Sequence, residues 1–134
     1  MANKYTENAL RFRRDASVHH NCAQAVIETF ADECGLTQEQ AFRLGAHFGG
    51  GMKMGSVCGA ITGGLMVIGL LGGDEQCRKD FTDAMRQNHE GMTDCRDLLR
   101  KNAETGTPKS EHCDGLVCEA VECVMRVMSY TGLF

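Results

Sequence analysis

Hydrophobic residues recur at helical spacing along most of the chain, and this periodicity predicts an all-α fold. The clearest stretch runs from about residue 111 to 129. Its apolar positions share one helical face, and Glu119, Glu122 and Arg126 lie opposite. That apolar face comprises Cys113, Leu116, Val117, Ala120, Val121, Val124, Val127 and Met128.

The same periodicity and the helix caps predict the remaining elements. We expect helices near residues 3–18, 22–34, 37–47, 57–71, 74–89 and 95–101. Thr6, Asn21 and the capping box that begins at Thr37 mark helix starts. In the 74–89 helix, Phe81 and Met85 should face inward. Residues 102–111 have the composition of the least ordered segment. Without a repeat or a long linker, residues 1–134 are expected to form a single domain.

A glycine-rich stretch, "GGGMKMGSVCGAITGGLMVIGLLGG", occupies residues 49–73. Its apolar run, residues 57–71, is shorter than the roughly twenty residues that a membrane span needs. Gly59 and Gly63, followed one position along by Ala60 and Gly64, form small-x-x-x-small pairs that let another helix approach closely. We therefore expect a compact single-domain helical bundle around this central Gly-rich apolar helix.

Charge and composition narrow the function classes. The net charge is −4 and the pI is near 5.7, so no electrostatic footprint for nucleic acid is present. Acidic and basic residues are mixed, which argues against binding to a membrane surface. The first fourteen residues lack the apolar centre of a secretory signal, so we expect a cytoplasmic protein.

The chain has eight cysteines, an excess that indicates redox or metal chemistry in a reducing compartment. No C-x-x-C motif occurs. Four cysteines, Cys22, Cys58, Cys95 and Cys113, fall in the first turn of a predicted helix, after a capping residue. Helix N-termini favour the thiolate over the thiol. The other four, Cys34, Cys77, Cys118 and Cys123, are expected to be ordinary buried residues.

The loop "GGGMKMG" precedes Cys58. Gly50 and Gly51 permit positive φ and, with Lys53, could form a nest for an anion. Lys53 is also expected to lower the pKa of Cys58, which makes Cys58 the first choice as nucleophile. The alternative is a sharp turn between helices. The Gly-Lys-Ser/Thr ending of a nucleotide-binding P-loop is missing.

Two histidines lie beside these cysteines. His20 lies two residues before Cys22, and His112 immediately precedes Cys113. Either could act as a base toward a thiol or complete a mixed Cys/His metal site. The alternative is an exposed polar side chain next to a helix cap.

The segments "NCAQAV", "FGGGMKMGSVCGAITGGLMVIGL" and "CRDLL", with the later Cys113, resemble the C_GCAxxG_C_C family. This is a bacterial and archaeal group of small helical proteins described as redox-active. The resemblance covers residues 20–125 and implies that Cys22, Cys58, Cys95 and Cys113 are the family's four cysteines. It departs from the motif name in having Val57 before Cys58 and a glycine after it. It also implies kinship in fold with split-Soret cytochrome c, whose haem-attachment pattern this chain lacks.

Three functions stay open at this point. In the first, the four cysteines form a redox site that exchanges thiols and disulfides, as in a thiol–disulfide oxidoreductase, with a redox partner protein or a small thiol. In the second, the four thiolates bind zinc or an iron–sulfur cluster. The first function, in contrast, needs no cofactor. In the third, the chain is a non-catalytic module that binds a partner or forms a homo-oligomer through its Gly-rich helix. The first two require the four sulfur atoms to lie near one point. A pocket for a small anionic or aromatic ligand over the glycine loop is a further alternative.

Overall fold

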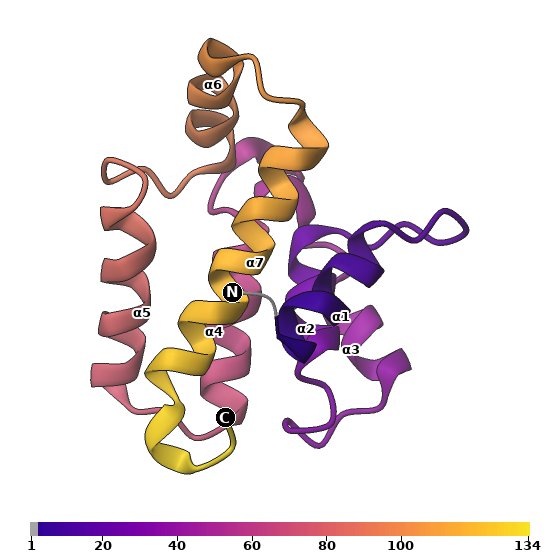
Figure 1. Cartoon of the computed structure of the whole chain (residues 1–134), viewed down its shortest axis with the longest axis vertical. Coiled ribbons are helices and arrows are strands. Elements are labelled where there is room, and N and C mark those ends of the chain that lie inside the picture. Colours follow the sequence, from indigo (N-terminus) through magenta and orange to yellow (C-terminus); the bar gives the residue numbers. More distant parts are fainter. Residues whose placement is uncertain (1–2) are drawn as a thin grey trace.

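The computed structural model describes residues 3–134, and their architecture is all-α, as predicted (Figure 1). The helices are α1 (Lys4–Arg13), α2 (Cys22–Thr29), α3 (Gln38–Gly45), α4 (Gly59–Leu70), α5 (Glu75–Gln87), α6 (Cys95–Thr105) and α7 (Lys109–Val127). Two short elements, η1 (Gly51–Gly55) and η2 (Ser129–Thr131), complete the list for this part of the chain. None of these helices is both long and apolar enough to cross a lipid bilayer.

Two helices, α4 and α7, form the middle of the bundle (Figure 1). The α5 helix packs against both on one side, and α2 packs against both on the other. The α1 and α3 helices cover α2, while α6 contacts α7 and η1 at one end of the molecule. Helices from both ends of the sequence therefore meet around α4.

The core is filled by large apolar side chains from α2, α4, α5 and α7. Phe81 and Met85 are fully buried, which confirms the inward face predicted for α5. The apolar face predicted for α7 is buried from Leu116 to Met128, although Val127 is only partly buried. The fully buried side chains of largest volume are Phe30, Phe81, Ile27, Met85, Met128, Val26, Val67, Val117, Val121 and Val124.

The glycines of α4 are sites of close packing. A Cβ atom on Gly63 would lie 3.0 Å from the backbone oxygen of Ala23 in α2, and one on Gly64 would overlap the ring of Phe81. The prediction that small residues allow another helix to approach closely is confirmed. Because α2 and Phe81 already cover this face, it is not available for self-association.

The predicted and observed helix boundaries agree best where a side chain caps the helix. Asn21 caps α2 and Thr37 completes a capping box, as predicted, and Asn21 also forms a capping box with Gln24. For α1, the cap is Asn3, and Thr6 instead occupies the third helical position of the box.

Helix ends differ more from the predictions. The first helix ends at Arg13, because the Asp15 carboxylate accepts hydrogen bonds from the N–H groups of Ser17 and Val18 and forms a turn. The second ends at Thr29, five residues early. The sixth continues to Thr105, inside the segment expected to be least ordered, and stops at Gly106 with φ +77°.

Candidate functional site

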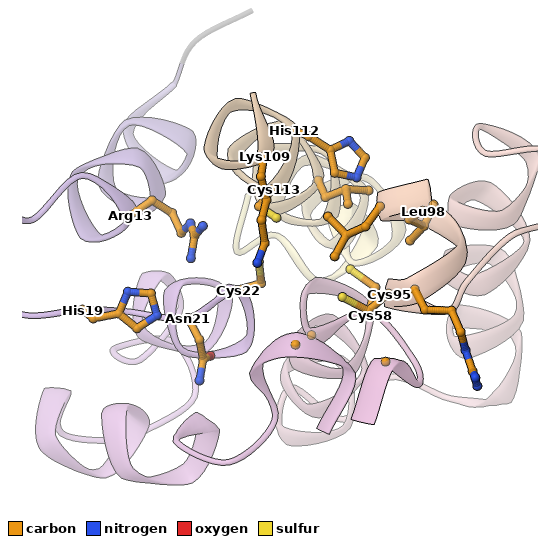
Figure 2. A pocket seen from close by; sticks show the side chains of 16 residues that line it. Arg13, His19, Asn21, Cys22, Cys58, Cys95, Leu98, Lys109, His112 and Cys113 are labelled. Carbon is orange, nitrogen blue, oxygen red and sulfur yellow. The ribbon is translucent and has the colours of Figure 1, made fainter. Parts of the chain in front are cut away.

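The four cysteines selected from the sequence line one cavity of about 390 Å³ (Figure 2). Cys22 comes from α2, Cys58 from the residue before α4, Cys95 from α6 and Cys113 from α7. These positions span most of the chain, so the cavity exists only in the folded protein. Cys34, Cys77, Cys118 and Cys123 do not line it.

Cys22 is held in place by the cap of its helix. The Asn21 side-chain oxygen accepts a hydrogen bond from the Gln24 N–H at 2.8 Å, and the side-chain amide donates to the Gly45 carbonyl at 3.0 Å. Asn21 therefore both begins α2 and fixes that end of it to the end of α3. The first residue of α2 is Cys22, as expected from the sequence.

Cys58 and Cys95 are brought together by a short antiparallel bridge between Val57 and Asp94. The Cys58 N–H donates to the Thr93 carbonyl at 2.8 Å, and the Cys95 N–H donates to the Ser56 carbonyl at 2.6 Å. The bridge fixes the starts of α4 and α6 beside each other. Figure 2 shows the two sulfur atoms pointing into the same space.

Cys113 departs from its predicted position in the first helical turn. The last helix begins at Lys109, right after Pro108, so Cys113 is its fifth residue. The free N–H groups of a helix N-terminus end with the first turn. Any stabilisation of a thiolate at Cys113 must therefore come from neighbouring side chains.

Arg13 reaches the cavity from α1. Its Nε atom donates to the Asp114 carboxylate at 2.9 Å, and its Nη1 atom donates to the His20 carbonyl at 2.8 Å. The guanidinium thus joins α1, α7 and the loop before α2, and its charge lies next to Cys113.

The thiols of Cys22 and Cys113 are neighbours in the cavity and shift each other's pKa in opposite directions. The interaction with Cys22 lowers the pKa of Cys113 to about 6, and the positive charges of Arg13 and Lys109 act in the same direction. The same interaction, together with burial, raises the pKa of Cys22 above its usual range. Of the two thiols, Cys113 is therefore the one that ionises more readily.

The other two cavity thiols favour the protonated form. Burial raises the pKa of Cys58 to about 11 despite hydrogen bonds from the backbone of Ala60 and Ile61, and burial also raises the pKa of Cys95. The prediction that Lys53 lowers the pKa of Cys58 is wrong, because Lys53 is exposed and does not line the cavity. The lysine that acts on a cavity thiol is Lys109.

The glycine-rich loop forms a left-handed turn. Gly50 and Gly51 have φ of +62°, as predicted, and Met52 and Lys53 have φ of +59° and +61°. Gly50 lines the cavity, whereas Gly51 and Lys53 do not. Gly51 backs onto the Ser56 backbone, which a Cβ atom would overlap. Of the expected anion nest, the structure places only Gly50 at the cavity.

The two histidines singled out from the sequence have different surroundings. His20 is buried away from the cavity, and its Nδ1 atom lies 2.7 Å from the Glu28 carboxylate. His112 lines the cavity, and its Nε2 atom is buried without a hydrogen-bond partner within residues 3–134.

Sequence reasoning missed several cavity residues: Arg13, His19, Arg96 and Lys109. Lys109 precedes Cys113 by four residues on one helix, a spacing that places two side chains on the same face and could have revealed it. Arg13 has no such signal, because its proximity to Cys113 depends on the packing of α1 on α7.

Metal ligation was the alternative chemistry for these cysteines. Across residues 3–134, no three side chains of histidine, cysteine, aspartate or glutamate are arranged to bind a common metal ion. Every cysteine of the chain is a free thiol in this structure.

Comparison with known proteins gives one match. No curated protein and no solved structure matches the chain. A family model described as "Putative redox-active protein (C_GCAxxG_C_C)" matches residues 20–127, a range that includes all four cavity cysteines. The chain belongs to the C_GCAxxG_C_C family, and the redox activity named in that description agrees with a cavity lined by four thiols.

Proposed function

We propose that this protein exchanges thiols and disulfides, with Cys113 as the attacking thiolate and Cys22 as the resolving thiol. The observation that carries the proposal is that these two cysteines, which come from different helices, are neighbours in one cavity that Arg13 and Lys109 also line. A thiolate next to a second thiol is the arrangement that disulfide exchange requires.

The reaction has two steps. The Cys113 thiolate attacks one sulfur of a substrate disulfide, so that a mixed disulfide forms, the substrate S–S bond breaks and one half leaves as a thiolate. Cys22 then gives up its proton, which the departing thiolate accepts, and attacks the Cys113 sulfur. The second half leaves as a thiolate. The substrate gains two electrons, and Cys22 and Cys113 become a disulfide.

Return to the reduced state needs a reductant. A small thiol or a dithiol partner protein serves this purpose by the reverse exchange, and its own sulfur atoms are oxidised to a disulfide. Run in the opposite direction, the same steps oxidise thiols.

Cys58 and Cys95 provide a second dithiol in the same cavity. Their backbones are joined by the Val57–Asp94 bridge, and their protonated state near neutral pH keeps them less reactive than Cys113. We assign them the role of a second redox pair. By exchange inside the cavity, Cys58 and Cys95 are oxidised to a disulfide while the Cys22–Cys113 disulfide is reduced.

The test is to map the disulfide by mass spectrometry during a redox titration. Reduced protein is equilibrated with dithiothreitol mixtures of increasing oxidation, free thiols are blocked at low pH, and linked peptides are identified. The Cys22–Cys113 disulfide should be the first to form. With the acyclic bis(2-hydroxyethyl) disulfide as the substrate, Cys22→Ser should stop the reaction at the mixed disulfide on Cys113, whereas Cys118→Ser, outside the cavity, should react as the parent does.

Two results would overturn the proposal. One is that the first disulfide forms between cysteines other than Cys22 and Cys113. The other is that protein purified without oxygen contains stoichiometric zinc or iron that protects all four cavity cysteines from alkylation. That result would favour the metal-binding alternative.

A further inference from the structure

We infer that the cavity takes a small disulfide that carries negative charge, such as one with a carboxylate on each half. The inference rests on the proposed exchange function and adds the class of substrate. Its basis is the charge of the lining: Arg13, Arg96 and Lys109 line the cavity, and no aspartate or glutamate does. The whole chain, by contrast, has a net charge of −4.

Most of this positive charge is uncompensated. Within residues 3–134, neither Arg96 nor Lys109 forms a salt bridge, whereas Arg13 is paired with Asp114, which lies outside the lining. Even with Cys113 as a thiolate, the lining keeps a surplus of positive charge. His19 and His112 also line the cavity and add further nitrogen atoms. A cleft with one sign of charge raises the local concentration of ligands of the opposite sign.

The position of the charges suits the reaction. Arg96 follows Cys95 in the chain, and Lys109 lies beside Cys113 (Figure 2). Both cations are exposed, so an entering anion meets them before it reaches the more buried thiols. An anionic disulfide is otherwise repelled by the Cys113 thiolate that must attack it. The two cations offset this repulsion, and they also stabilise the thiolate that leaves.

The size of the cavity indicates a small molecule. Its volume of about 390 Å³ is near the lower end of the range for small-molecule sites. Leu98, Leu99 and Leu116 provide an apolar wall for a short carbon chain. Cys58 is only 4% exposed, which is too enclosed for a folded protein surface to reach.

The experiment compares three disulfides of similar size and different charge. These are cystamine, which is a dication, bis(2-hydroxyethyl) disulfide, which is neutral, and 3,3′-dithiodipropionate, which is a dianion. Each rate of exchange with the reduced protein is divided by the rate with free 2-mercaptoethanol, which removes differences in intrinsic reactivity. At low salt, we expect the normalised rate of the dianion to exceed that of the dication about tenfold or more. The preference should shrink at 0.5 M salt.

Matched variants locate the charges responsible. Lys109→Gln and Arg96→Gln should each reduce the ratio of dianion to dication rates several-fold. The ratio compares two substrates at the same thiol, so any change in the reactivity of Cys113 cancels. Arg100→Gln is the control, because Arg100 lies on the same helix as Arg96 but outside the cavity, and it should leave the ratio unchanged.

The outcomes separate this inference from the proposed function. Exchange at Cys113 with equal normalised rates for the three disulfides, or with a preference for cystamine, overturns the anionic substrate and leaves the exchange function standing. The anionic substrate is also overturned if Arg100→Gln reduces the ratio of dianion to dication rates as much as Lys109→Gln and Arg96→Gln do. Absence of exchange with all three disulfides overturns the proposed function, and this inference with it.

Discussion

Removal of the thiol next to Cys113 tests the electrostatics of the site most directly. In the parent protein, the interaction with Cys22 is the largest cause of the low pKa of Cys113, about 6, and we attribute it to a hydrogen bond that Cys22 donates to the thiolate. Hydrogen bonds to charged groups contribute about 1.5–3 kcal/mol, and each 1.36 kcal/mol corresponds to one pH unit. Cys22→Ala should therefore raise the pKa of Cys113 by about one to two pH units, while Arg13 and Lys109 continue to stabilise the thiolate.

The assay is alkylation by iodoacetamide as a function of pH, with mass spectrometry of the peptide that contains Cys113. The midpoint of the rate profile gives the pKa and does not depend on the nucleophilicity of the thiolate, which falls as its pKa falls. We expect a midpoint near 6 for the parent protein and about 7 to 8 for Cys22→Ala. Cys22→Ser is the matched control, because its hydroxyl group still donates a hydrogen bond and should keep the midpoint close to that of the parent.

Two results would refute this reasoning. A parent midpoint near the model thiol value of about 8.5 would mean that Cys113 is not a stabilised thiolate. A midpoint that is low in the parent and unchanged in Cys22→Ala would assign the stabilisation to the cations alone. In that case, Lys109→Gln would raise the midpoint more than Cys22→Ala does.

Three further predictions concern stability. Gly64→Ala should destabilise the fold by about 1–3 kcal/mol, because the added Cβ overlaps the fully buried Phe81. Gly69→Ala in the same helix meets open space and should stabilise the fold by up to about 1 kcal/mol. The melting temperatures of the two variants should shift in opposite directions, and equal shifts would contradict the prediction. Asn21→Ala should lower the free energy of unfolding, measured by urea denaturation, by about 2 kcal/mol, because the helix cap and the hydrogen bond to α3 are lost. A decrease below about 0.5 kcal/mol would contradict this prediction. His112→Leu should raise stability by about 1 kcal/mol in the same assay, because the buried Nε2 atom has no partner within residues 3–134, and a fall in stability would show that it has one.

Local features of the sequence were sufficient to predict much of the fold. Asn21 and Thr37 cap their helices through hydrogen bonds to residues only three positions away, so the spacing of these residues in the sequence is enough to predict the caps. The glycines of the central helix likewise indicated close packing, although the sequence did not show that the partner is α2. The end of α1 was missed because a short turn around Asp15 competes with the helix.

Local patterns in the sequence were enough to predict the helical class, most helix starts and the four cysteines that line the cavity. Which of those thiols ionises most readily depends instead on how the helices pack. The sequence favoured Cys58 because Lys53 is near it along the chain, but in space Arg13 and Lys109 lie beside Cys113. The physical reason is that the pKa of a thiol depends on burial and on distances to charges, and these are set by how separate helices pack.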